Sequence, residues 1–470
     1  SRSVGKAQRK VEERNFLIRK NILEYDEVMD HQRHDFYGMR QEVLEGRGIK
    51  ERIFEHLDLG IEDACWRFLD ELYLGTCMSE WVRENLGVSI PAERFAGKDR
   101  DDLHDLVRRE GKEEAGSTIE VTLGEYLSEE INLGKGKIVE RDVHGDDYQG
   151  LADWARGHFK ADLKPADLRA LDRQGIVDAL QNAADTLIDT ADLAGLDPFL
   201  VEHHAQHELA NWVASKFGTE VPPETYEDLE DPEEAILRIR EEARALYADR
   251  ETRYPVEFTM DMATMAMERN PQAALARFCA WARHRFELDW KPDALPSTNP
   301  LVLKDILLAE AARWDDDRKL QRARRAVAES EGGEGLSEWF QEHMGIPLSE
   351  EDRERAEEDA ETVAVEHVSA VLRSEMLHLE RWILLQIVDG AWKDHLYAMD
   401  QLRESIGYRS FSQRDPRIEF KREGANLYEE MHMEIRDRIT DLIFKAKLQV
   451  QARPAPPQQG AAPPAQAPQA

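Results

Sequence analysis

Cysteine is scarce in this sequence of 470 residues, and Cys65, Cys77 and Cys279, the three that occur, form no closely spaced pair. Small secreted domains rely on dense disulfide frameworks, and zinc ribbons need CxxC pairs. The sequence therefore excludes both classes and is typical of a protein from a reducing compartment.

Long apolar runs are also absent. The best one, residues 382–388, is seven residues long and contains Gln386. A membrane-spanning helix needs about 18 or more consecutive apolar residues. The sequence predicts a soluble chain of cytoplasmic type.

Positive charge is in short supply. The chain carries 62 Lys and Arg against 96 Asp and Glu, a formal net charge of −34. Proteins that bind nucleic acid need clustered Lys and Arg to neutralise phosphates, so nucleic acid is excluded as the main partner. Hydrophobic residues make up 41% of the chain, which is too many for wholesale disorder.

Proline is missing from the first 90 residues, from residues 348–415 and from residues 417–453. Because an interior proline costs a helix about 3 kcal/mol, these windows permit very long helices. In the first window, apolar residues from Val4 to Val43 recur at steps of three, four or seven. This stripe predicts a single helix about 60 Å long, at 1.5 Å per residue.

The C-terminal windows predict a helical hairpin. Ser349 is followed by three acidic residues, which is typical of a helix start. Helical spacing runs from Leu372 to Ile406 and resumes from Phe420 to Leu442, which places the turn near residues 407–416. We expect the first long helix to pack against this hairpin.

The middle of the chain is less regular. Shorter helices are predicted for residues 50–86, 166–216, 232–248, 258–288 and 302–329. Residues 118–123 and 137–143 alternate with β-branched side chains and predict a small β-hairpin. Residues 452–470 are rich in Pro, Ala, Gln and Gly and predict a disordered tail. The fold class predicted is all-α.

No motif for nucleotide chemistry stands out. The nearest match to a phosphate-binding loop spans residues 111–118 and has Ser117 at the position of the essential lysine. We expect a polar surface loop there and no nucleotide site in this chain. No catalytic residue is assigned.

Histidines cluster at His203, His204 and His207. On a helix, His203 and His207 would share a face and could hold a metal, but Asn211 breaks the HExxH pattern. We expect exposed helix histidines and no metal site. A metal-dependent hydrolase remains the last-ranked alternative.

The turn of the predicted hairpin has an unusual composition. Its five basic residues against two acids give a local net charge of +3 in an acidic protein. Tyr408 and Phe411 lie in the turn itself, where burial is least expected. Two interpretations stay open from the residues alone: the rings staple the turn to a neighbouring helix, or they form a contact tip on a rigid lever.

Two long segments resemble a known family. Residues 7–33 read AQRKVEERNFLIRKNILEYDEVMDHQR and resemble the long scaffold-domain helix of SecA, the bacterial preprotein translocase motor. Residues 384–431 read LLQIVDGAWKDHLYAMDQLRESIGYRSFSQRDPRIEFKREGANLYEEM and resemble the two-helix finger of that family. The middle is only loosely similar to the family's helical wing domain.

This resemblance implies four regions: a scaffold helix (1–48), an enlarged wing domain (49–348), a scaffold continuation with the finger (349–450) and a tail (451–470). It implies that the complete motor uses ATP and magnesium to push unfolded preproteins through the SecYEG channel. Further implied partners are the motor's own ATPase domains, an anionic membrane surface and a second copy in a homodimer. The implied location is the cytoplasm and the cytoplasmic face of the membrane.

The finger tip would contact substrate and channel. The residues that the resemblance assigns to the tip are Tyr408, Arg409, Phe411, Gln413, Arg414 and Arg417. Phe411 stands where the family usually has tyrosine, and the Cys-rich zinc tail of many members is missing. Since the family's ATPase domains are missing too, we expect a C-terminal fragment or a split subunit. A non-enzymatic helical adaptor is the alternative function.

Overall fold

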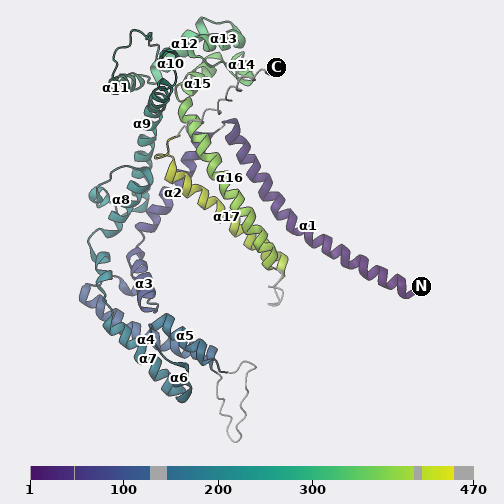
Figure 1. The fold of residues 1–470 in the computed structure, drawn as a ribbon, viewed down its shortest axis with the longest axis vertical. Coiled ribbons are helices and arrows are strands. Elements are labelled where there is room, and N and C mark those ends of the chain that lie inside the picture. Colours follow the sequence, from purple (N-terminus) through teal and green to yellow (C-terminus); the bar gives the residue numbers. More distant parts are fainter. Residues whose placement is uncertain (1, 47, 128–145, 407–414, 449–470) are drawn as a thin grey trace, which may run out of the picture. The chain divides into compact units, whose positions relative to one another are not determined.

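The computed structural model describes residues 2–46, 48–127, 146–406 and 415–448. Within these ranges the regular structure is helical and no strand occurs (Figure 1). Contacts divide the chain into two compact units, one formed by Ser1–Gly60 with Glu241–Ala470 and the other by Ile61–Arg240. The all-α prediction is confirmed, whereas the predicted domain boundaries stay a prediction.

The first unit joins the N-terminal helix to the C-terminal half of the chain. Its helices are α1 (Arg2–Glu45), the start of α2 (Ile49–Phe68), most of α9 (Pro232–Met267), α10 (Pro271–Phe286), α11 (Pro300–Ala311), α12 (Asp316–Ala328), α13 (Gly332–Met344), α14 (Glu350–Ala356), α15 (Ala360–Leu372), α16 (Ser374–Ser405) and α17 (Pro416–Leu442). As the absence of proline predicts, α1 is one uninterrupted helix.

Helices α16 and α17 form the predicted hairpin and lie side by side, with α1 packed against both (Figure 1). Ile383 and Ile387 of α16 and Ile435 and Ile439 of α17 are buried, as their spacing predicts. The second helix begins at Pro416, which needs no hydrogen-bond acceptor for its nitrogen at this position. The expected packing of the first helix on the hairpin is confirmed.

The helix start predicted at Ser349 is also confirmed. The Asp352 amide donates a hydrogen bond of 3.0 Å to Ser349 Oγ, so Ser349 caps α14. The segment then divides, because Asp359 caps a new helix, α15, by accepting from the Thr362 amide. Helix α16 follows directly after Arg373.

The predicted helix break between residues 248 and 258 is wrong. Helix α9 runs through Pro255, although proline has no N–H to donate to the carbonyl of Glu251 one turn earlier. Packing therefore outweighs the local cost of this residue. Val256, directly after the proline, is fully buried.

The second unit is a compact helical domain with its own core. Its elements are the end of α2, α3 (Tyr73–Leu86), η1 (Ala92–Phe95), α4 (Arg100–Tyr126), α5 (Tyr148–Phe159), α6 (Pro165–Ala170), α7 (Arg173–Thr190), η2 (Ala194–Leu200), α8 (His204–Phe217), η3 (Pro223–Tyr226) and the start of α9. The predicted helix over 50–86 is therefore broken between α2 and α3, and 166–216 is divided among α6, α7, η2 and α8.

The predicted strand at residues 118–123 is wrong, because these residues lie within α4. Ala115, Ile119 and Leu123 are buried at steps of four, which is the helical period. Packing against α7 therefore overrides the β-branched composition of the segment. The second predicted strand, 137–143, and the predicted tail, 451–470, lie outside the described residues.

The surface loop expected at residues 111–118 is likewise the interior of α4. A Cβ atom on Gly111 would lie 3.5 Å from both Ile188 Cδ1 and Val88 Cγ2. These are ordinary contact distances, and Gly111 is buried, so the segment packs against its neighbours instead of forming a surface loop.

Candidate functional site

The predicted contact tip lies mostly outside the described residues. Tyr408, Arg409, Phe411, Gln413 and Arg414 fall in the gap between 406 and 415. The structure describes the two helix ends that flank this gap, here called the base of the hairpin. They include Arg417, and they contact α1.

A small apolar core fixes the base of the hairpin to α1. Phe420 of α17 is 1% exposed and meets the ring of Tyr25 edge-on, with centroids 4.7 Å apart. Met399 and Ile406 of α16 complete the buried cluster, and Val28 of α1 packs against it. The two segments that resemble the SecA family, residues 7–33 and 384–431, therefore contact each other next to the turn.

Arg417 ties the first turn of α17 to α1. Its Nε and Nη2 donate to the two carboxylate oxygens of Asp415 at 3.0 and 2.7 Å, and its Nη1 donates to Glu24 Oε2 at 3.0 Å. The hydrogen bonds from the Arg417 side chain lower the pKa of Asp415 to about 2. Asp415 thus stays ionised at physiological pH, and it also accepts the Arg417 amide as the helix cap.

Further charge pairs follow the same pattern, with acids on α1 and bases on the hairpin. Arg403 of α16 lies 3.6 Å from Asp26, and Lys421 of α17 lies 3.4 Å from Glu27. Each exposed pair adds little stability by itself. Together with Arg417 and Glu24, they set one register of the hairpin along α1.

A buried polar contact joins all three helices. Gln32 of α1 is 5% exposed and donates from Nε2 to the Gly424 carbonyl oxygen of α17 at 2.9 Å. Its Oε1 lies 3.0 Å from Nε2 of His395 in α16, and burial lowers the pKa of that histidine. A Cβ atom on Gly424 would lie 2.9 Å from Cε of Met399, so the glycine lets this flexible side chain pack closely against α17.

The N-terminal half of α1 extends beyond the hairpin without a neighbour from the first unit (Figure 1). Val11, Phe16 and Leu23 are 58%, 62% and 68% exposed. Phe16 and Leu23 are seven residues apart and share one face of the helix, and exposed apolar side chains on one face suit a surface that binds another protein domain. The predicted apolar stripe includes Val11 but not Phe16 or Leu23, so the spacing of apolar residues predicted the helix but not this exposed face.

The histidine cluster differs from its prediction. His203 precedes α8 with a left-handed backbone, φ = 58°, so it does not share a helical face with His207. His207 Nε2 instead lies 2.8 Å from Glu227 Oε1, and the three histidines are partly buried rather than exposed. In the described part of the chain, no three His, Cys, Asp or Glu side chains gather closely enough to hold a metal.

No helix within the described residues is long and apolar enough to cross a membrane. No solved structure matches this chain. Many curated proteins match this chain. The three described below are protein translocase subunits.

One relative matches along nearly the whole chain. Protein translocase subunit SecA 1 of Rhodopirellula baltica is 32% identical over 467 residues, which is 95% of this chain and 37% of the relative. SecA subunits of Endomicrobium trichonymphae and Pelotomaculum thermopropionicum are 43% and 47% identical over 86 and 73 residues. These two matches cover 18% and 16% of this chain and 10% and 8% of the relatives. The chain thus spans little more than a third of the first relative's length.

A family model, the SecA Wing and Scaffold domain, matches residues 1–276 and 304–447. These residues include α1, the whole second unit and the hairpin whose base is described above. The match along most of the chain and the similarity to the R. baltica protein agree with the packing of α1 on the hairpin. The chain belongs to the SecA family, as its wing and scaffold region.

Proposed function

We propose that this chain is the mechanical part of a larger ATP-driven motor that pushes unfolded preproteins through the SecYEG channel. The relatives are named protein translocase subunits, and this chain corresponds to 37% of the R. baltica protein. ATP and magnesium would be bound by the remainder of the motor. The complete protein would work in the cytoplasm and dock on the cytoplasmic face of the membrane.

The observation that carries this proposal is the division of α1 into two parts. Residues from Tyr25 to Phe36 are fastened to the hairpin by apolar, charged and buried polar contacts. Val11 and Phe16, further toward the N-terminus, expose apolar surface to which the ATPase domains would bind. Intact backbone hydrogen bonds let such a helix move as one body. A displacement at the exposed part would therefore reach the base of the hairpin.

At the other end, the tip would touch the moving polypeptide. An aromatic ring such as Phe411 contacts many kinds of side chain without sequence preference. Arg409, Arg414 and Arg417 would orient the tip at the channel.

Two substitutions in the complete motor test the two ends separately. Phe411→Ala should sharply reduce preprotein transport into SecYEG vesicles with basal ATP hydrolysis nearly intact, whereas Phe411→Tyr, which keeps the ring, should be close to neutral. Phe16→Asp should reduce transport in the complete motor yet leave the melting temperature of this chain alone unchanged. The matched control, Val121→Asp, changes an equally exposed side chain on α4. Equal transport by the alanine variant and the parent would contradict the role of the tip.

A further inference from the structure

A pocket of about 320 Å³ lies among α2, α9, α12 and α15 of the first unit. Three cationic side chains, Lys50, Lys319 and Arg373, line it together with a single carboxylate, Glu251. Apolar side chains, among them Trp314, form the rest of the wall. Each of the three cations also has a carboxylate partner, Glu251, Glu380 or Asp316.

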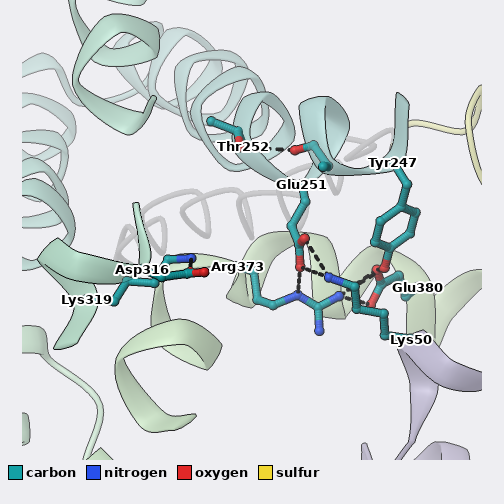
Figure 2. Close-up of polar contacts among 9 residues, drawn as sticks. Lys50, Tyr247, Glu251, Thr252, Asp316, Lys319, Arg373 and Glu380 are labelled. Carbon is teal, nitrogen blue, oxygen red and sulfur yellow. Dashed lines mark hydrogen bonds and ion pairs between the residues drawn. The ribbon is translucent and has the colours of Figure 1, made fainter. Parts of the chain in front are cut away.

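The carboxylates near the pocket are already paired with cations of the protein (Figure 2). The Lys50 ammonium lies 2.8 Å from one oxygen of Glu251, and Arg373 Nε lies 2.5 Å from the other. Arg373 Nη2 binds both oxygens of the fully buried Glu380 at 2.9 and 3.0 Å, and Tyr247 donates its hydroxyl to the same carboxylate. The acidic groups are therefore satisfied by partners within the protein.

Donors, in contrast, are left over. One terminal nitrogen of Arg373 points away from this network without a contact in Figure 2. The indole nitrogen of Trp314 is buried with no hydrogen-bond partner among the described residues, and the side chain is only 6% exposed. Among the described residues Lys319 forms an ion pair with Asp316, whose side chain is 99% exposed, so that pair is weak. Buried N–H groups usually find an acceptor, and a ligand in the pocket would supply one.

We propose that this pocket binds a phosphate group through Arg373 Nη1, the Lys319 ammonium and the Trp314 indole N–H. Three separate donor groups suit phosphate, which presents three strong acceptor oxygens, better than carboxylate, which presents two. The apolar wall leaves room for a small organic substituent on the phosphate. This site lies within the first unit.

Calorimetric titration of this chain with inorganic phosphate and with glycerol phosphate tests the proposal. Saturable one-to-one binding is expected, weakened about tenfold or more by Lys319→Gln or Trp314→Phe, since each removes one hydrogen bond to a charged group. Arg373 is left intact because it also neutralises Glu380. The matched control is Lys304→Gln, which removes a lysine paired with Glu257 outside the pocket and should leave binding unchanged.

A second arm identifies the source of the phosphate. Vesicles of phosphatidylglycerol and of phosphatidylcholine are mixed with the chain, with and without glycerol phosphate. Lys319-dependent binding to phosphatidylglycerol that glycerol phosphate displaces indicates a lipid headgroup, whereas saturable binding of the soluble phosphates alone indicates a free metabolite. Absence of saturable binding by every probe, or equal affinity of the Lys319→Gln variant and the parent, would overturn the proposal.

Discussion

The phenyl ring of Phe36 in α1 stacks on the indole of Trp392 in α16, with ring centroids 4.3 Å apart and planes inclined by 10°. Both side chains are buried, at 1% and 6% exposure. The contact joins residues from opposite ends of the chain, next to the buried Gln32 that links α1 to α16 and α17. It is therefore a sensitive position at which to test the scaffold.

Phe36→Ala should lower the free energy of unfolding of the first unit by about 3–5 kcal/mol, because it leaves a cavity and removes the stacked pair. Urea denaturation followed by circular dichroism measures the change. The matched control is Phe16→Ala on the same helix, where the side chain is 62% exposed and little change is expected. Equal midpoints for Phe36→Ala and the parent would show that α1 does not depend on this contact.

Much of this scaffold could be predicted from the sequence, for a physical reason. Where proline is absent and apolar residues keep a helical period, as from Tyr25 to Phe36 and from Ile383 to Ile387, local and tertiary preferences agree. At residues 118–123 they disagree: Thr118, Ile119, Val121 and Thr122 favour a strand locally, while the helix buries Ile119 and Thr122 and leaves Val121 71% exposed.

The candidate sites were less predictable. The basic turn was visible as a composition, and the pairing of Arg417 with Glu24 could have been suspected from acids on one segment and bases on the other. The association of Lys50, Glu251 and Arg373 could not, because three segments distant in sequence supply them. Nothing local marks a charged residue as buried until the packing that buries it is known.

The buried carboxylate of Glu380 provides a second test. Burial raises its pKa, and the Arg373 guanidinium opposes that shift. Arg373→Met should cost about 3–5 kcal/mol of stability, because it leaves a buried charge without its cation. Adding Glu380→Leu should recover most of the loss, since the double variant buries no unpaired charge. Thermal or urea unfolding of the two single variants and the double variant measures this coupling; strictly additive losses would contradict it.

A third prediction concerns pH. Burial, together with the nearby charges of Arg52, His432 and Arg436, lowers the pKa of His56 in α2 to about 4. Between pH 6.5 and pH 4, His56 therefore binds a proton in the unfolded chain but not in the folded chain. Stability is full above pH 6.5 and falls as the pH drops toward 4, by up to about 3 kcal/mol from this residue.

His56→Gln should flatten this pH dependence of the unfolding free energy. Some slope should remain, because His395 and His432 in the same scaffold also have pKa values lowered by burial. The matched control is His31→Gln on the exposed face of α1, which should leave the slope unchanged. An unaltered slope in the His56 variant would place the acid sensitivity elsewhere.

The last prediction concerns the clamp formed by Arg417, Asp415 and Glu24 at the base of the finger. Asp415 holds two nitrogens of the guanidinium and Glu24 of α1 holds the third. Glu24→Gln keeps the cap and the arginine in place but removes the charge that fixes α17 against α1. Because these side chains are only partly buried and remain in contact with water, the melting temperature should hardly change. Transport by the complete motor should nevertheless fall several-fold, since the direction of the tip would no longer follow α1.

Lys421→Gln is the control: its pair with Glu27 is longer, at 3.4 Å, and more exposed, so transport should stay near that of the parent. If Glu24→Gln and Lys421→Gln transported equally well, the clamp would be only a surface ion pair, and the apolar core around Phe420 alone would set the direction of the finger.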